Sequence, residues 1–305
     1  MLVLGIGGGG DVVGALAVAR LCESLGTPFA LGGIAWERFA VDPHPGPRPL
    51  TEIGDARPIG EGSVLAGPQT ATPEGTPFAE AGMAAHLGAE TVLVDVTGGA
   101  LGAAAGIEAA VKALGCDLVV GVDVGGDVLA RGEEPGLQSP LCDAVMVAAL
   151  LQASGKVEPL LAVIGAGCDG ELSVAQVLER VADLGRAGAW FGTWGPTREI
   201  ADELAEAATV VPTEASLQVA RCARGESGVA YIRQGRRRVE LGPIGALSFF
   251  FDLRTAASEL PLARAVAGTE TIEDARAALA ALGVRTELDY ERERAAGQSG
   301  TKGSK

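Results

Sequence analysis

Histidine is almost absent from this chain of 305 residues, which contains only His44 and His86. Neither lies at metal-ligand spacing from a second ligand, and no G-x-S-x-G motif supplies a nucleophilic serine. A P-loop is also missing, because the C-terminal "SGTKGSK" has no strand before it. These absences argue against a histidine metal site, hydrolysis by a nucleophilic serine and P-loop phosphotransfer.

Cysteine pairs and long apolar runs are missing as well. The five cysteines are an odd number, are widely spaced and form no C-x-x-C pair (Cys22, Cys116, Cys142, Cys168 and Cys222). This pattern predicts neither a disulfide framework nor a thiolate zinc site, and it indicates a reducing compartment. The sequence also has no run of about 18 apolar residues and no signal-peptide pattern. We therefore expect a soluble, cytoplasmic protein.

The chain has few positively charged residues. It contains 24 lysines and arginines and 39 aspartates and glutamates, which gives a net charge of −15. Such a surface repels the phosphate backbone of nucleic acids and the anionic lipids of a membrane. We therefore expect a small-molecule substrate and neither a nucleic-acid nor a membrane partner. Homo-oligomerisation stays open.

Apolar residues, in contrast, make up 48% of the chain and recur in short blocks. Blocks that are apolar almost continuously are typical of strands covered on both faces, and they occur at 2–4, 29–34, 91–96, 118–122 and 160–164. Helical patterns occur at 12–25, 79–88, 101–114, 140–153 and 173–185. This alternation predicts an α/β fold with a doubly wound, mostly parallel, Rossmann-like sheet and helices on both of its faces.

Residues 40–78 depart from this alternation, since they are rich in proline and lack periodicity. A segment of this length is too long for an ordinary connection between a strand and a helix. We expect a lid or a flank of the active site, and its mobility stays open.

Beyond residue 190 the pattern changes. Helices are predicted at 197–208, 213–224 and 271–282, with a hairpin in "VAYIRQGRRRVEL" and a strand in "LSFFFD". We interpret residues 1–292 as one domain, with a core at 1–190 and an α+β extension of the same sheet at 191–292. A separate small C-terminal domain is the alternative. The polar segment 293–305 is expected to be a disordered tail or a cloning scar.

Four loops that combine glycine with carboxylates follow four of the predicted strands: Gly5–Asp11, Asp95–Gly99, Gly121–Asp127 and Gly165–Glu171. In a parallel sheet, loops after neighbouring strands meet at one edge, and ligands bind there at the topological switch point. Each loop alone is more simply explained as a turn whose aspartate caps the next helix. Together the four loops predict a binding site.

The first loop, "GIGGGGD", fits the pattern G-x-G-x-x-G, which can hold a phosphate at a helix N-terminus. We expect its glycines to approach a ligand closely: Gly7, Gly8, Gly9 and Gly10. A dinucleotide site also needs an acidic residue near the end of the second strand, and Glu37 comes later than that spacing. Asp11 would repel a phosphate unless a cation lay between them. The loop therefore favours a phosphate with a metal, or a hydroxyl-rich ligand, over a nicotinamide cofactor.

Asp123 and Asp127 lie four residues apart, with further carboxylates on the neighbouring loops. Carboxylate oxygens suit Mg²⁺, the candidate cofactor, with Asp123 and Asp127 as its ligands. The same groups can instead act as general acid and base if burial raises one pKa. Both alternatives stay open. We expect Asp11, Asp123 and Asp127 to be catalytic, and a further set to bind substrate: Gly98, Gly99, Gly125, Gly126, Asp169 and Glu171.

Three further stretches carry candidate side chains. "AWERF" places Trp36, Glu37 and Arg38 after the second strand, where they either stack on a ring and clamp an anion or pack the long loop. Arg236, Arg237 and Arg238 are more simply explained as a solvated edge strand than as a phosphate clamp. The stretch 212–216, "PTEAS", is interpreted first as a helix start and second as part of a site.

Several motifs, taken in order along nearly the whole chain, resemble the family called domain of unknown function 1152. They are "LGIGGGGDVVGALA", "WERFAVDPHPGPRPLTEI", "VDVTGGALG", "VVGVDVGGDVLARGEEPGLQSPLCDA", "GAGCDGELS", "PTEAS", "FFFD" and "GVRTELDYER". The resemblance implies a single full-length unit and supplies no reaction.

The residues favour an enzyme that acts on a nucleotide, a nucleoside or a sugar phosphate. Hydrolysis or transfer of a glycosyl or phosphoryl group by carboxylates, with Mg²⁺ as a candidate helper, fits a chain that is poor in histidine. An NAD(P)-dependent oxidoreductase and a non-catalytic nucleotide-binding sensor are the alternatives.

Overall fold

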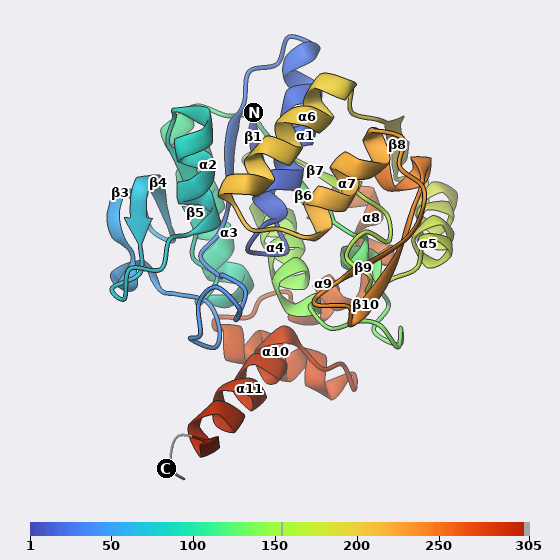
Figure 1. The fold of residues 1–305 in the computed structure, drawn as a ribbon. Helices are drawn as coiled ribbons and strands as arrows, with labels where there is room; N and C mark the ends of the chain where they lie inside the picture. Colours follow the sequence, from blue (N-terminus) through green and yellow to red (C-terminus); the bar gives the residue numbers. More distant parts are fainter. Residues whose placement is uncertain (154, 302–305) are drawn as a thin grey trace.

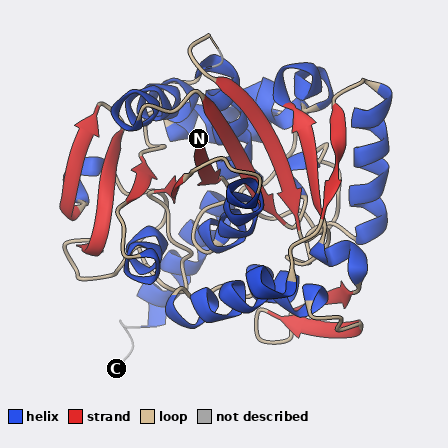
Figure 2. Ribbon diagram, turned by 90° about the horizontal axis from the view of Figure 1, so that it is seen from above, coloured by secondary structure: helices blue, strands red, loops and turns tan. Residues whose placement is uncertain are grey.

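A nine-stranded mixed sheet forms the centre of the molecule, with the strand order β3-β4-β5-β2-β1-β6-β7-β11-β8 (Figures 1 and 2). The computed structural model describes residues 1–153 and 155–301, with side chains to residue 297. The strands of the sheet are β1 (Leu2–Gly5), β2 (Ala30–Ile34), β3 (Gly54–Gly60), β4 (Ser63–Ala71), β5 (Thr91–Val94), β6 (Leu118–Val124), β7 (Glu158–Ile164), β8 (Trp190–Trp194) and β11 (Ser248–Asp252).

Five neighbouring strands, β5-β2-β1-β6-β7, run parallel, as the apolar blocks predict. Strand β1 is buried along its whole length, with Leu2 and Leu4 in one apolar core and Val3 in the other. Burial on both faces explains why these segments are apolar without alternation.

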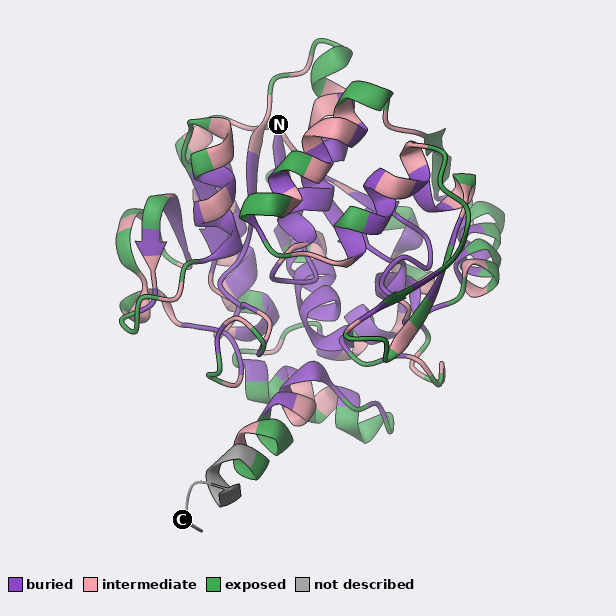
Figure 3. Ribbon diagram, in the orientation of Figure 1, coloured by how far each residue is buried: buried purple, intermediate pink, exposed green. Residues whose placement is uncertain are grey.

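Helices cover both faces of the sheet, so the doubly wound Rossmann-like prediction is confirmed. One face carries α1 (Asp11–Ser24), α2 (Ala79–Leu87), α6 (Arg198–Val210) and α7 (Ala215–Ala223). The other carries α3 (Gly99–Leu114), α4 (Pro140–Ala153), α5 (Val174–Arg186), α9 (Pro261–Val266) and α10 (Ile272–Ala281). Burial is concentrated in the sheet and in the helix faces that meet it (Figure 3).

The segment 40–78, which was expected to be a lid or a flank of the active site, contains regular secondary structure. After a short 3₁₀ turn, η1 (Leu50–Glu52), residues 54–71 form the hairpin β3–β4, which continues the sheet antiparallel to β5. The exposed, proline-containing pattern of β3 reflects its place at the sheet edge, where one side of the strand lacks a partner. Of residues 40–78, Ala40 lines the large cavity described below, as does Phe39 just before this segment.

The C-terminal part extends the same sheet, as expected. Strand β11 pairs antiparallel with β7, and β8 pairs with β11, so the predicted strand in "LSFFFD" lies inside the sheet. The predicted hairpin forms a separate two-stranded sheet of β9 (Gly228–Ile232) and β10 (Arg237–Leu241).

Short helical segments complete the chain: η2 (Asp127–Leu129), η3 (Pro243–Ala246), α8 (Leu253–Ala256) and η4 (Ala257–Glu259). Helix α11 (Glu287–Thr301) lies below the body of the molecule in Figure 1 and occupies the segment 293–301, where composition predicted disorder or a cloning scar. Residues 302–305 of that segment lie outside the described residues. Within residues 1–153 and 155–301, no helix combines the length and the apolar character that crossing a membrane requires.

Candidate functional site

The topological switch point of the sheet lies between β1 and β6. The chain leaves β1 through α1 toward β2 on one side, and it leaves β6 through α4 toward β7 on the other. Because α1 and α4 lie on opposite faces, their N-termini and the end of β6 border one crevice. Asp11 begins α1, Asp143 lies in the first turn of α4, and Asp123 lies near the end of β6.

These three residues form the first triad, in which one oxygen of each carboxylate lies within 4.8 Å of the others. Asp11 Oδ2 accepts a hydrogen bond from Gly7 N (3.1 Å), and Asp123 Oδ2 accepts one from Gly126 N (2.8 Å). Asp123 Oδ1 and Asp143 Oδ1 are buried and have no hydrogen-bond partner among the described residues. Burial raises the pKa of Asp11 to about 6 and the pKa values of Asp123 and Asp143 well above their ordinary range.

A second triad, Asp127, Asp169 and Glu171, comes from the loops after β6 and β7 and meets the same 4.8 Å criterion. Burial raises the pKa of Asp169 to about 7 and that of Asp127 well above its ordinary range. Burial also acts to raise the pKa of Glu171, but Arg237 and the hydrogen bond from Ser139 outweigh it and hold that pKa below its ordinary value. Both oxygens of Asp169 are buried without a hydrogen-bond partner among the described residues.

The two triads are neighbours. Asp123 and Asp143 of the first triad both add to the negative charge around Asp127 of the second. Asp11 and the whole second triad line a small cavity of about 30 Å³. Asp11, Asp123, Asp127, Asp169 and Glu171 therefore lie together, and they come from three of the four loops that were expected to meet at one edge of the sheet.

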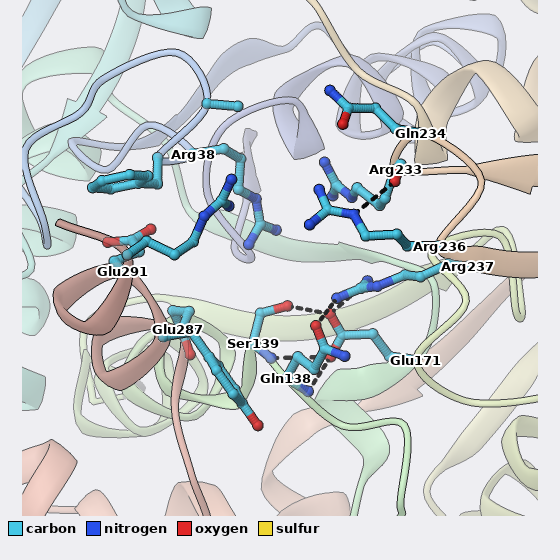
Figure 4. Close-up of a pocket in the computed structure, with 14 residues that line it drawn as sticks. Arg38, Gln138, Ser139, Glu171, Arg233, Gln234, Arg236, Arg237, Glu287 and Glu291 are labelled. Atoms are coloured by element: carbon cyan, nitrogen blue, oxygen red, sulfur yellow. Dashed lines mark hydrogen bonds and ion pairs between the residues drawn. The ribbon is translucent and has the colours of Figure 1, made fainter. Parts of the chain in front are cut away.

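A larger cavity of about 390 Å³ lies next to the triads, and Arg38, Ser139 and Glu171 line both spaces (Figure 4). Five guanidinium groups border it, from Arg38, Arg233, Arg236, Arg237 and Arg294. We call it the arginine cavity. Phe39 and Tyr290 supply apolar surface, and Glu287 and Glu291 of α11 close one side. Its size lies in the range of small-molecule sites.

Arg237 and Arg38 reach the carboxylates in different ways. Arg237 Nη1 pairs with Glu171 Oε1 (2.9 Å), and its Nη2 donates to Gln138 Oε1 (2.7 Å), as the dashed lines of Figure 4 show. Burial acts to lower the pKa of Arg38, yet Asp11 and other acidic neighbours raise it above its ordinary value. Among the described residues the Arg38 guanidinium has no hydrogen-bond partner, so its donors remain free for a ligand.

Arg236, Arg237 and Arg238 were interpreted as part of a solvated edge strand, and this holds for only some of them. Arg238 is exposed and pairs with Glu240, whereas Arg237 turns toward Glu171 from the other face of β10. Arg236 is exposed but still borders the arginine cavity.

The glycines of the first loop are needed mainly for contacts within the protein. A Cβ at Gly7 would overlap the Asp11 carboxylate, and one at Gly10 would overlap the Thr213 side chain. Gly8 and Gly9 have positive φ and pack against Trp36 O and the Arg38 stem. Of these four glycines, Gly10 alone borders a described cavity, so the expected close approach of a ligand to Gly7, Gly8 and Gly9 finds no cavity there.

The loop after β5 lies apart from the triads. Gly98 packs against Gly102, and Gly99, at φ +61°, packs against the backbone of Thr269 and Thr271. Neither borders the described cavities, so the structure does not bring them to the expected substrate site. Asp95 instead accepts a hydrogen bond from Leu50 N (3.1 Å).

Gly125 and Gly126 make room for the acidic groups. A Cβ at Gly125 would overlap the Asp169 carboxylate, and Gly126, at φ +109°, donates its N–H to Asp123. They shape the site without lining its cavities.

Trp36 and Glu37 were expected either to bind the substrate or to pack the long loop. Both are buried, and neither lines the arginine cavity. Trp36 Nε1 donates to Glu291 Oε2 (3.2 Å). Glu37 Oε1 accepts from Ala79 N (2.6 Å) at the start of α2, and burial raises the pKa of Glu37 to about 7. Of the three residues in this stretch, only Arg38 reaches the site.

Four site residues escaped sequence reasoning: Asp143, Ser139, Arg233 and Glu287. Asp143 had a usable signal, because a carboxylate in the first turn of the helix after β6 must lie at the strand-end edge of the sheet. Arg233 and Glu287 had none, because nothing local indicates that the hairpin turn and the start of α11 pack beside Arg38 and Ser139.

The fold and the site define a Rossmann-like α/β protein with an acidic crevice at its switch point and arginines around the opening. Residues 2–295 match the family described as Protein of unknown function (DUF1152), and the chain belongs to this family. No curated protein and no solved structure matches the chain.

Proposed function

We propose that this protein is an enzyme that binds a phosphorylated small molecule, a nucleotide or a sugar phosphate, in the arginine cavity. It would hydrolyse that molecule or transfer a glycosyl or phosphoryl group with the buried carboxylates. The observation that carries the proposal is that the arginine cavity shares Arg38, Arg233 and Glu171 with the small cavity that Asp11 and the whole second triad border.

The arginines support an anionic ligand. In a chain with a net charge of −15, five arginines around one cavity are a local reversal of charge. Arg38 has free donors, and Arg233 has only a distant ion pair with Glu214 (3.8 Å). Guanidinium groups bind phosphate through paired N–H donors, and they attract anions more strongly where water is excluded.

The carboxylates support proton transfer. A carboxyl whose pKa lies near 7, as that of Asp169 does, can take a proton from water or give one to a leaving oxygen near neutral pH. Asp127, buried beside Asp123 and Asp169, is the second candidate for this role.

The two alternatives make different demands on the site. A nicotinamide-dependent oxidoreductase needs Glu37 to hold a ribose, but the Glu37 carboxylate is engaged with Ala79 N at the start of α2. A non-catalytic sensor would use the same arginine cavity, and turnover separates it from an enzyme.

Thermal-shift measurements with matched pairs of ligands test the binding. Each pair contains a phosphorylated compound and its unphosphorylated parent, in EDTA and in Mg²⁺. We expect only phosphorylated compounds to raise the Tm, and Arg38→Gln to remove the effect. Arg198→Gln, which removes an exposed arginine of α6, is the matched control and should respond like the natural protein.

Equal responses to both members of every pair, or a full response in Arg38→Gln, would refute the anion site. Turnover of the bound compound is then followed by product release, and Asp127→Asn should abolish it. Tight binding without any product would identify a sensor instead of an enzyme.

A further inference from the structure

Several buried carboxylate oxygens of the two triads have no hydrogen-bond partner among the described residues, and binding of an anion in the arginine cavity would not give them one. We propose that each triad binds one divalent cation of the Mg²⁺ or Mn²⁺ type, so that the site holds a pair of ions beneath the arginine cavity. The inference rests on the proposed function only where it places the ions opposite a phosphorylated ligand; the ion sites themselves are argued from the carboxylates.

The first triad brings together carboxylate oxygens from three separate elements, and two of these oxygens are unpaired. Asp11 at the start of α1, Asp123 of β6 and Asp143 of α4 are at most 7% exposed, and their ligand oxygens lie within 4.8 Å of one another. Asp123 Oδ1 and Asp143 Oδ1 have no hydrogen-bond donor among the described residues. Hard carboxylate oxygens that converge in this way suit a small divalent cation.

The second triad presents its free oxygens at the small cavity. Asp169 is 6% exposed, and neither of its oxygens has a partner among the described residues. The cavity of about 30 Å³ that borders Asp127, Asp169 and Glu171 is small enough for an ion with little water. Glu171 is held in place by Arg237 and by the amides of Gln138 and Ser139.

Protonation alone does not satisfy these oxygens. A proton shared with a neighbouring carboxylate would satisfy one oxygen of a neutral carboxyl, but both oxygens of Asp169 are buried without a hydrogen-bond partner among the described residues. A buried polar group without a partner costs about 1–3 kcal/mol, and more if it is charged. A cation satisfies several oxygens at once and also offsets their mutual repulsion.

Asp123 near the end of β6 and Asp127 at the start of η2 lie four residues apart, so the two triads are side by side. Paired divalent ions about 3.5–4 Å apart are a recurrent arrangement in enzymes that act on phosphate esters. Cations at this position would also separate Asp11 from a phosphate, which removes the repulsion that the sequence leaves unresolved.

Titration with Mn²⁺ alone tests the inference. EDTA-treated protein receives Mn²⁺ without any phosphorylated compound, and electron paramagnetic resonance counts the ions that leave solution. We expect two ions per chain in the natural protein and one or none in Asp169→Asn and in Asp143→Asn. Asp117→Asn, an exposed position with the same change of charge, is the control and should still bind two.

Melting temperatures in EDTA show whether the variants fold. Asparagine keeps the volume of aspartate and removes a buried like charge, so we expect Tm values no lower than that of the natural protein. Binding of no ion or of a single ion by the natural protein, or two ions in folded Asp169→Asn, would overturn the inference. The anion site is measured separately in EDTA with Arg38→Gln, so the failure of one proposal leaves the result for the other unaffected.

Discussion

Glu291 makes the stability of the fold depend on pH. This residue of α11 is 7% exposed, and its Oε2 accepts hydrogen bonds from Gly46 N (2.8 Å) and from Trp36 Nε1 (3.2 Å). Burial raises its pKa from 4.5 to about 7; Glu287 adds to this effect, and the two hydrogen bonds and Arg38 only partly oppose it.

The sign follows from proton uptake. Between pH 4.5 and pH 7 the folded state holds a proton on Glu291 that the unfolded chain has released. The free energy of unfolding therefore falls as the pH rises through this window. Because each tenfold change in a protonation equilibrium is worth about 1.4 kcal/mol, the contribution of Glu291 amounts to about 3 kcal/mol.

Glu291→Gln removes this titration and keeps an oxygen that accepts the same two hydrogen bonds. We expect its free energy of unfolding, relative to that of the natural protein, to increase by about 3 kcal/mol between pH 4.5 and pH 8. Urea denaturation at several pH values, followed by tryptophan fluorescence, measures the difference. The comparison isolates Glu291, because the other buried carboxyls are common to both proteins.

Glu293→Gln is the matched control on the same helix, because Glu293 is exposed and pairs with the exposed Arg285. Its stability profile should run parallel to that of the natural protein. A parallel profile for Glu291→Gln as well would refute the reasoning.

Three further predictions concern stability and are measured by urea denaturation. Gly10→Ala should destabilise the fold by about 1–3 kcal/mol, because the new Cβ overlaps Thr213, whereas Gly102→Ala, in open space within α3, should stabilise it by up to about 1 kcal/mol. Equal effects of these two substitutions would contradict the packing argument. Ser173→Ala should cost about 0.5–2 kcal/mol, because Ser173 forms the capping box of α5, and an unchanged midpoint would argue against that cap. Phe251→Ala should cost about 3–5 kcal/mol, because this residue of β11 is fully buried in the apolar core, and a loss below about 1 kcal/mol would show that the core collapses around the gap.

The parallel core of the fold was predictable from the sequence because its signals are local. Continuous apolar blocks such as β1 and β6 specify burial on both faces, and the glycine and aspartate after each of them mark the strand ends. The hairpin β3–β4 was not predictable in this way. Its partner β5 lies beyond helix α2, and the prolines of residues 40–78 obscure its alternation.

The acidic half of the site was likewise predictable, whereas the arginine half was not. Asp11, Asp123 and Asp169 follow strands whose order places them together. Arg233 belongs to the turn of a hairpin outside the main sheet, and only the packing of that hairpin brings it to the cavity. The sequence run of three arginines shows no preference between solvent and site, and Arg237 and Arg238 indeed take opposite sides of one strand.

The glycine loop after β1 shows how a motif can point to the correct place for a different reason. Its glycines accommodate Trp36, Arg38 and Thr213, so the close approach that they permit is made largely by the protein itself. The consequence for the site is nevertheless direct. By letting the stem of Arg38 pack against Gly9, the loop brings that guanidinium next to Asp11. A larger residue at Gly9 would therefore move Arg38, which borders both cavities. The loop thus shapes the site by positioning Arg38 and Asp11, and the pattern G-x-G-x-x-G by itself carries no evidence for a dinucleotide.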